Sequence, residues 1–211
     1  VEWIWGYREN DRLGGNDVYS ASKASAELII NAYIKSFFKD HKNIFISSVR
    51  AGNVIGGGDW AHNRIVPDIY RAWSNNKPVE IRSPNSPRPW QHVLEPLSGY
   101  LQLAHKLWED EKLHGESFNF GPREDVNQPV LDLVDNLSNF WNHEENFKLY
   151  KILELNSIKE ANLLKLNCDK SFTKLDWQAN LNFLETTRFV GEWYRDFYNK
   201  NFDTQELTTN Q

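Results

Sequence analysis

The sequence predicts an α/β protein built on a parallel sheet, and three features of its 211 residues support this fold class. A long apolar segment at 18–38 has helical periodicity, and a short apolar segment at 43–49 has the composition of a strand. A glycine-rich loop follows at 50–59. Alternating helices and short strands are typical of parallel sheets, which bind ligands at the carboxyl ends of their strands. We therefore expect a ligand beside this loop.

The N-terminal region is expected to be a loop over residues 1–17, with a glycine-rich turn at its end. Asp17 can cap the helix that follows, which we place at 18–38. The apolar surface of this helix is wider than a single stripe. Its apolar residues are Leu28, Ile29, Ile30, Ala32, Tyr33, Ile34, Phe37 and Phe38. A helix that is apolar on two sides is either deeply buried or paired with another chain.

The rest of the chain continues the alternation of helices and strands. Further helices are expected at 66–74, 94–109, 130–141 and 184–198. Strands are expected at 79–82 and 117–120, with a weaker one at 147–150. The proline-rich segment 83–90 is expected to be a loop, and the polar tail from residue 199 is expected to fray.

Composition limits the classes of function. The 24 basic and 29 acidic residues give a net charge of −5, which argues against binding to nucleic acid or to a membrane surface. Cys168 is the only cysteine, and the histidines lack metal-ligand spacing, so we expect no disulfide, no metal site and a cytoplasmic location. No apolar segment approaches the roughly 20 residues that span a bilayer. The chain begins at Val1 and contains no Met, so we expect a fragment.

Tyr19 and Lys23 are the first candidate catalytic residues. They are four positions apart within the expected helix, so their side chains lie on one face. A lysine ammonium beside a phenol favours the phenolate, which can take a proton from a sugar or alcohol hydroxyl. The alternative is that the pair lies on a solvated face without a catalytic role. YxxxK is short, so its support must come from other segments.

Several segments, in order along nearly the whole chain, resemble the extended short-chain dehydrogenase/reductases of the NAD-dependent epimerase/dehydratase type. Within them the chain resembles the CDP-glucose 4,6-dehydratases. The run 88–95 (RPWQHVLE) separates this group from UDP-glucose epimerases and dTDP-glucose dehydratases better than YxxxK does. The matching segments are 3–10, 19–23, 50–60, 64–68, 88–97, 118–122, 164–166, 175–177 and 192–194.

The resemblance implies a partial Rossmann-type parallel sheet with a smaller mixed α/β substrate-binding part. Residues 1–60 would be the C-terminal part of the dinucleotide-binding domain, 61–198 mostly the substrate-binding part with some returning Rossmann elements, and 199–211 a polar tail. The implied cofactor is NAD, and the implied substrate is CDP-glucose or a similar sugar nucleotide. A homo-oligomer would form through the 18–38 helix.

The resemblance also implies a reaction, the conversion of CDP-D-glucose to CDP-4-keto-6-deoxy-D-glucose and water. Tyr19 would accept the proton of the C4 hydroxyl, and Lys23 would assist it and hydrogen-bond the nicotinamide ribose. The chain departs from the family pattern because it has no GxxGxxG turn. It also has no Ser or Thr before Tyr19. We therefore expect part of an active site, and no catalysis from the isolated chain.

Five further residues are candidates for substrate binding. The planar guanidinium of Arg88 suits a diphosphate, although it can also be an ordinary surface residue. Asn53 can hydrogen-bond the substrate or close a turn. Arg64 can meet the nucleotide or serve as a surface charge at a helix start. Trp90 and His92 can line the nucleotide pocket or belong to the packing of the protein.

Other readings remain open. Arg50 can be a buried partner of a structural ion pair, and nothing argues for a reactive thiolate at Cys168. The chain can belong to a sugar-nucleotide 4-epimerase or another dehydratase of the same fold. It can also be a catalytically dead remnant, or a module that binds sugar nucleotides or dimerises.

Overall fold

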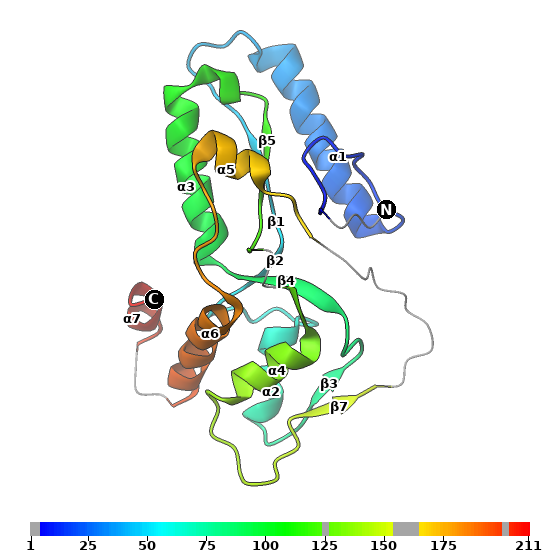
Figure 1. Cartoon of the computed structure of the whole chain (residues 1–211), viewed down its shortest axis with the longest axis vertical. Coiled ribbons are helices and arrows are strands. Elements are labelled where there is room, and N and C mark those ends of the chain that lie inside the picture. The colour runs from blue at the N-terminus through cyan, green and yellow to red at the C-terminus, as the bar shows by residue number, and fades with distance from the viewer. Residues whose placement is uncertain (1–4, 124–126, 154–164, 200–202) are drawn as a thin grey trace.

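The computed structural model describes residues 5–123, 127–153, 165–199 and 203–211. Figure 1 shows two packed groups of elements that are joined through the strands β2 and β4. Each group has its own hydrophobic core. The polypeptide passes between the two groups more than once, so neither group is a continuous stretch of sequence.

The first group is built on two parallel strands, β1 (Ser48–Ala51) and β5 (Ser117–Phe120). The helix α1 (Val18–Tyr33) continues as one π-helical turn, η1 (Ile34–Phe38). On the opposite side of the strands lies α3 (Leu94–Glu109), which Figure 1 shows beside the shorter α5 (Asp169–Leu175). A 3-10 turn, η2 (Glu111–Leu113), leads into β5. The buried side chains of this core are Leu103, Leu107, Leu113, Phe118, Phe120, Leu175, Trp177 and Ala179.

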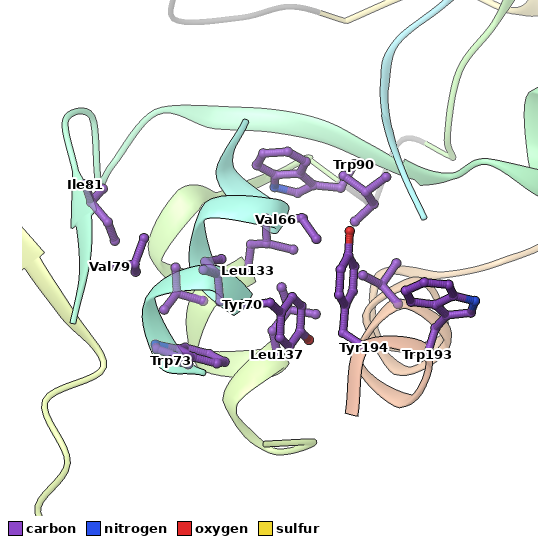
Figure 2. Packing of buried hydrophobic residues seen from close by; sticks show 14 of the residues in the cluster. Val66, Tyr70, Trp73, Val79, Ile81, Trp90, Leu133, Leu137, Trp193 and Tyr194 are labelled. Carbon is purple, nitrogen blue, oxygen red and sulfur yellow. The ribbon is translucent and has the colours of Figure 1, made fainter. Parts of the chain in front are cut away.

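The second group surrounds the larger core, which Figure 2 shows. Its helices are α2 (Ile65–Trp73), α4 (Val130–Ser138) and α6 (Phe183–Tyr198). The strands β3 (Val79–Ile81) and β7 (Tyr150–Ile152) pair in parallel at its edge. The buried side chains of this core are Ile55, Val66, Ile69, Tyr70, Trp73, Val79, Ile81, Trp90, Leu133, Val134, Leu137, Phe183, Val190, Trp193 and Tyr194.

A three-stranded sheet connects the two groups. β2 (Asn53–Ile55) pairs in parallel with β4 (Pro87–His92), and β4 pairs on its other side with the antiparallel β6 (Asn127–Pro129). The side-chain amide of Gln91 donates to the backbone oxygen of Phe120 over 3.0 Å. This hydrogen bond ties β4 to the end of β5, so the carboxyl end of the first sheet lies beside the connecting sheet.

The predicted α/β class with parallel strands is confirmed, and so are the long helices. Asp17 caps α1 as predicted, since its carboxylate accepts from the backbone N–H of Ser20 over 2.9 Å. Strongly periodic segments fold at or close to the expected positions because one apolar face of each must be buried. Along α1, however, no residue is buried within the described chain, although its sequence is apolar on two sides.

Four expectations about local structure are wrong. The strand expected at 147–150 is β7, which begins only at Tyr150. The first strand begins at residue 48, whereas we expected 43–49. The proline-rich segment 83–90 was expected to be a loop, but 87–92 is the strand β4, because the fixed φ of proline also fits extended backbone. The tail does not fray over the residues that the structure describes: α7 (Thr204–Thr209) is capped by Asp203 and packs on α6. The indole N–H of Trp193 donates to the hydroxyl of Thr208 over 3.2 Å.

Candidate functional site

A cavity of about 670 Å³ opens where β1 leads into β2, at the carboxyl end of the parallel strands. Four of the predicted site residues line it, namely Tyr19, Asn53, Arg64 and Trp90. They come from three separate parts of the sequence, which the fold brings together. The cavity therefore lies where the glycine-rich loop 50–59 was expected to hold a ligand.

Tyr19 lies in the first turn of α1, with 71% of its surface exposed. The ammonium of Lys23 lies 5.6 Å from the centre of the Tyr19 ring, as the four-residue spacing requires on a helix. Lys23 itself is not among the residues that line the cavity. The arrangement gives an accessible phenol at the cavity edge with a cation beside it.

Arg50 and Glu27 hold α1 against the sheet. The guanidinium of Arg50, on β1, donates to both carboxylate oxygens of Glu27 over 2.6 and 2.7 Å, and to the backbone oxygen of Glu9 over 3.2 Å. Glu27 lies four residues beyond Lys23 and therefore on the same face of the helix as Tyr19 and Lys23. The ion pair between Arg50 and Glu27 thus turns this face toward β1. This confirms the interpretation of Arg50 as a structural ion-pair partner.

Asn53 and Trp90 lie opposite each other in the β2–β4 pairing. The indole N–H of Trp90 donates to the backbone oxygen of Gln128 over 3.0 Å, and the side chain is buried. Trp90 therefore presents an aromatic surface to the cavity, while its polar atom is used inside the protein. Asn53 is partly buried and contributes a residue with both a donor and an acceptor.

Arg64 is the residue that precedes α2, and it has extended backbone geometry. Its neighbour Asn63 has a φ of 61°, so the chain turns sharply before the helix begins. The side chain of Arg64 is exposed and makes no hydrogen bond or ion pair with the residues that the structure describes, while the backbone oxygen of Arg64 accepts from the N–H of Asp68 over 3.0 Å. A planar guanidinium at a cavity wall is suited to binding a phosphate or diphosphate through two hydrogen bonds.

Arg88 and His92 lie outside the residues that line the cavity. Arg88 is partly buried on β4, where its guanidinium donates to the backbone oxygen of Pro87 over 2.9 Å. His92 is fully buried, with its ring 5.5 Å from that of Phe189. Burial lowers the pKa of His92 to about 4, so the imidazole is neutral at pH 7. The roles of Arg88 and His92 in binding stay predictions.

Two other residues of the run 88–95 have structural roles. Gln91 joins β4 to β5, as described above. The carboxylate of Glu95 is buried and accepts from the backbone N–H groups of Asn180 and Leu181 over 2.9 and 2.6 Å. The run therefore positions the connecting sheet and the segment that leads into α6.

Sequence reasoning did not identify three other residues at the cavity, Tyr7, Asp59 and Lys165. Tyr7 and Lys165 come together because the backbone N–H of Tyr7 donates to the oxygen of Lys165 over 2.8 Å. Such a pairing between distant segments leaves no periodic pattern in the sequence. Lys165 adds a second positive charge to the cavity wall.

The described residues give no support for a reactive cysteine, a metal site or a membrane-spanning helix. Burial raises the pKa of the Cys168 thiol to about 11, and its sulfur accepts from the backbone N–H of Gly121 over 3.1 Å, neither of which favours a reactive thiolate. In this part of the chain, no three His, Cys, Asp or Glu side chains are grouped as metal ligands would be. None of its helices has the length and apolar character needed to cross a membrane.

Comparisons with known proteins point to one family. Residues 6–121 match the model of the NAD dependent epimerase/dehydratase family. Over 198 residues, the chain is 44% identical to a CDP-glucose 4,6-dehydratase of Salmonella typhimurium, a match that covers 92% of this chain and 54% of the relative. The chain thus spans about half the length of that relative.

Solved structures show the same fold. A dTDP-glucose 4,6-dehydratase from Bacillus anthracis in complex with NAD superposes with a TM-score of 0.73 at 20% identity, covering 96% of this chain and 58% of the other. A UDP-glucuronic acid 4-epimerase from Bacillus cereus in complex with NAD gives a TM-score of 0.68 at 17% identity, covering 92% and 57%. At these identities the likeness establishes the Rossmann-like α/β fold.

Proposed function

Because the chain belongs to the NAD dependent epimerase/dehydratase family, we propose that it is part of an NAD-dependent sugar-nucleotide 4,6-dehydratase. The proposed reaction converts CDP-D-glucose to CDP-4-keto-6-deoxy-D-glucose and water. The observation that carries the proposal is the cavity that brings Tyr19 together with Asn53, Arg64 and Trp90. A proton acceptor, a cation and an aromatic surface around one space suit a sugar joined to a nucleoside diphosphate.

The choice of CDP-glucose rests on the 44% identity to the Salmonella relative of that name. In the proposed binding mode, Arg64 binds the diphosphate and Asn53 hydrogen-bonds the sugar or a phosphate. Trp90 packs against the nucleotide. Arg88 and His92 are proposed to contribute from β4, Arg88 toward the diphosphate and His92 behind the nucleotide pocket.

NAD is the proposed cofactor, and the described residues suit its nicotinamide end. Lys23 lies beside Tyr19. In the proposed complex Lys23 would hydrogen-bond the nicotinamide ribose, and the Tyr19 phenol would lie next to the C4 hydroxyl. When bound, NAD supplies a hydride acceptor for C4 that later returns the hydride to C6. The sequence has no GxxGxxG turn to hold the pyrophosphate, so this chain contributes only part of the cofactor site.

The residues of this chain move one proton in the proposed mechanism. The Tyr19 oxygen accepts the proton of the C4 hydroxyl as the C4 ketone forms, with the Lys23 ammonium beside its ring. The ketone acidifies the hydrogen on C5, and water is then lost across C5 and C6. The hydride returns to C6 and a proton returns to C5, which gives the 4-keto-6-deoxy product. Arg64 and Asn53 hold the diphosphate and the sugar so that C4 faces Tyr19. They would thereby lower the activation barrier by orienting the substrate.

Two further properties are part of the proposal. The full-length enzyme is a homo-oligomer that pairs through the 18–38 helix, whose exposed apolar residues include Leu28, Ile29 and Phe37. The enzyme is cytoplasmic, because a doubly charged nucleotide sugar does not cross a membrane unaided. We propose no nucleic-acid partner, in keeping with the net charge of −5.

The test is a chimera in which this chain replaces the matching segment of the Salmonella dehydratase. We expect the purified chimera to convert CDP-glucose to a product that has lost one water, measured by mass spectrometry and NMR. Epimerised CDP-hexose of unchanged mass would instead assign a 4-epimerase. Binding of CDP-glucose without turnover would assign a binding module, and failure of the 211-residue chain itself to bind CDP-glucose would contradict the proposal.

A further inference from the structure

The segment 56–64, between β2 and α2, forms one wall of the cavity. Gly56, Asp59, Asn63 and Arg64 from this segment all line the space. The segment has three consecutive glycines and two left-handed residues, with a φ of 76° at Gly58 and 61° at Asn63. Because the segment is neither helix nor strand, the shape of this wall depends on the side chains that hold its backbone.

Three consecutive carbonyl groups of this segment accept hydrogen bonds from side chains. The hydroxyl of Tyr194 donates to the oxygen of Asp59 over 2.6 Å. The guanidinium of Arg71 donates to the oxygens of Trp60 and Ala61 over 2.7 and 2.8 Å. Arg71 is close in sequence, on α2, whereas Tyr194 is 135 residues away on α6. The helix α6 therefore reaches the wall of the proposed substrate site.

Aromatic packing presses the same segment onto α6. The Trp60 ring lies 5.4 Å from that of Tyr194 and 4.8 Å from that of Phe197. A Cβ atom at Gly57 would stand only 2.2 Å from the ring of Trp193, so this approach requires a glycine. The contact fixes the loop at a distance from the helix that no other residue type permits.

Tyr194 has a matched neighbour that lacks its hydrogen bond. The rings of Tyr194 and Tyr70 stack at 4.2 Å and 9°, and Figure 2 shows their hydroxyl oxygens pointing in different directions. The Tyr70 hydroxyl is buried without a hydrogen-bond partner among the described residues. Burial raises the pKa of Tyr194 far above its usual range, so its hydroxyl stays protonated and donates to Asp59.

We propose that Tyr194 is a positioning residue for substrate binding. Its hydroxyl fixes the carbonyl of Asp59, and through it the loop 56–60, so the wall that carries Asp59 and Arg64 is already formed when the sugar nucleotide arrives. A loop that must be ordered during binding lowers the affinity by the cost of that ordering. The identity of the ligand rests on the proposed function. The ordering of loop 56–60 by the Tyr194 hydroxyl does not depend on which ligand binds.

The experiment compares Tyr194→Phe with the control Tyr70→Phe in the 211-residue chain. Both changes remove one hydroxyl and keep the ring stack. Hydrogen–deuterium exchange reports on the backbone amides of 57–61, and isothermal titration with CDP-glucose reports on binding. We expect Tyr194→Phe to speed exchange in this segment about fivefold, which corresponds to one ordinary hydrogen bond, and to raise Kd by a similar factor. Tyr70→Phe should leave both quantities unchanged.

Every outcome bears on the inference. If the loop exchanges in Tyr194→Phe as it does in the wild type, Tyr194 does not position it. Faster exchange throughout the molecule, or a variant that does not unfold cooperatively, would make Tyr194 a purely structural residue and overturn the proposal. A wild-type chain that does not bind CDP-glucose contradicts the proposed function, and the exchange comparison alone then decides the role of Tyr194.

Discussion

At the scale of single residues, Tyr19 combines the two properties that a proton acceptor needs. It is exposed at the cavity edge, and the ammonium of Lys23 lies 5.6 Å from its ring. A catalytic phenol must be both reachable and influenced by a nearby charge, and a solvated helix pair alone would not place Tyr19 at a cavity. The position of Asn53 and Arg64 in the same cavity adds groups that can hold a substrate in front of it.

The first prediction concerns Tyr19→Phe in the active chimera. Removing the hydroxyl eliminates the proton acceptor while the ring is kept, so we expect kcat to fall by about 100-fold or more, with KM changed little. Steady-state kinetics with CDP-glucose measure both. Tyr33→Phe, on the same helix but outside the residues that line the cavity, is the control. Full turnover by Tyr19→Phe would remove Tyr19 from the mechanism.

The second prediction concerns Arg64→Ala. The side chain has no described partner inside the protein, so its loss should cost little stability. Charge-assisted hydrogen bonds to a diphosphate should be lost, and we expect Kd for CDP-glucose to rise about tenfold or more. Titration calorimetry on the 211-residue chain gives Kd, with Arg188→Ala, an exposed arginine on α6, as the charge-matched control. Equal losses in both variants would show only a general charge effect.

The sequence predicted the positions of residues that depend on a local pattern, but not of those that depend on contacts between distant segments. The Tyr19–Lys23 geometry follows from helix periodicity, and the ion pair of Arg50 was among the alternatives drawn from its place on a strand. Lys165 could not be found in this way, because its place at the cavity depends on a backbone pairing with Tyr7 across 158 positions of sequence. Contacts of that range are set by the tertiary fold and leave no local pattern.

At the scale of elements, α1 differs from the two other 16-residue helices, α3 and α6, because none of its residues is buried within the described chain. Glu27 faces β1 through its ion pair with Arg50, and Ile29, two positions on, points across the helix from it. Ile29, Tyr33 and Phe37 are spaced by four residues and are 58%, 55% and 69% exposed. An apolar stripe of this kind, turned away from the sheet, is suited to a second copy of the same helix.

The third prediction is that Ile29→Lys weakens self-association. A lysine in the centre of an apolar helix interface places an unpaired charge there on both copies, so we expect the molar mass of the wild-type assembly to fall toward that of a monomer. Size-exclusion chromatography with light scattering measures this over a range of concentrations. Leu184→Lys is the control, because Leu184 is similarly exposed at 63% but lies on α6. A wild-type chain that is monomeric at all concentrations would contradict the proposed interface.

Elements were predictable in proportion to their length and periodicity. The helices α3 and α6 span 16 residues each and lie at or within one residue of the expected positions. β2 has only three residues and was not predicted at all, since a strand this short is defined by its partner β4. The prolines that made 83–90 look like a loop are tolerated in β4 because proline has an extended-compatible φ.

At the scale of the whole molecule, the cavity lies where the two packed groups meet. The parallel strands β1 and β5 end at the cavity with their carboxyl ends. The parallel pair β2 and β4 continues from there toward the second core. Residues 94–120 and 165–179 return to the first core after the chain has entered the second. The helix α6 packs against β4 at this junction.

His92 lies at this junction, and it gives the molecule a defined sensitivity to acid. The ring is buried between β4 and Phe189 of α6, and one ring nitrogen has no hydrogen-bond partner among the described residues. Burial lowers the pKa from its ordinary value of 6.5 to about 4. Between these two values the unfolded chain binds a proton at this position and the folded chain does not, so folding becomes less favourable as the pH falls through this window.

The fourth prediction is that His92→Gln removes this part of the pH dependence. From the two pKa values, the wild type should lose about 3 kcal/mol of unfolding free energy between pH 7.5 and pH 4 through His92, in addition to what other groups contribute. Urea unfolding of the wild type and of His92→Gln at intervals of pH isolates the His92 contribution as the difference in slope. His105→Gln, an exposed histidine on α3, should keep the wild-type slope. If His92→Gln and the wild type lose stability in parallel from pH 6.5 to pH 4, the buried imidazole does not control the acid stability of the junction beside the cavity.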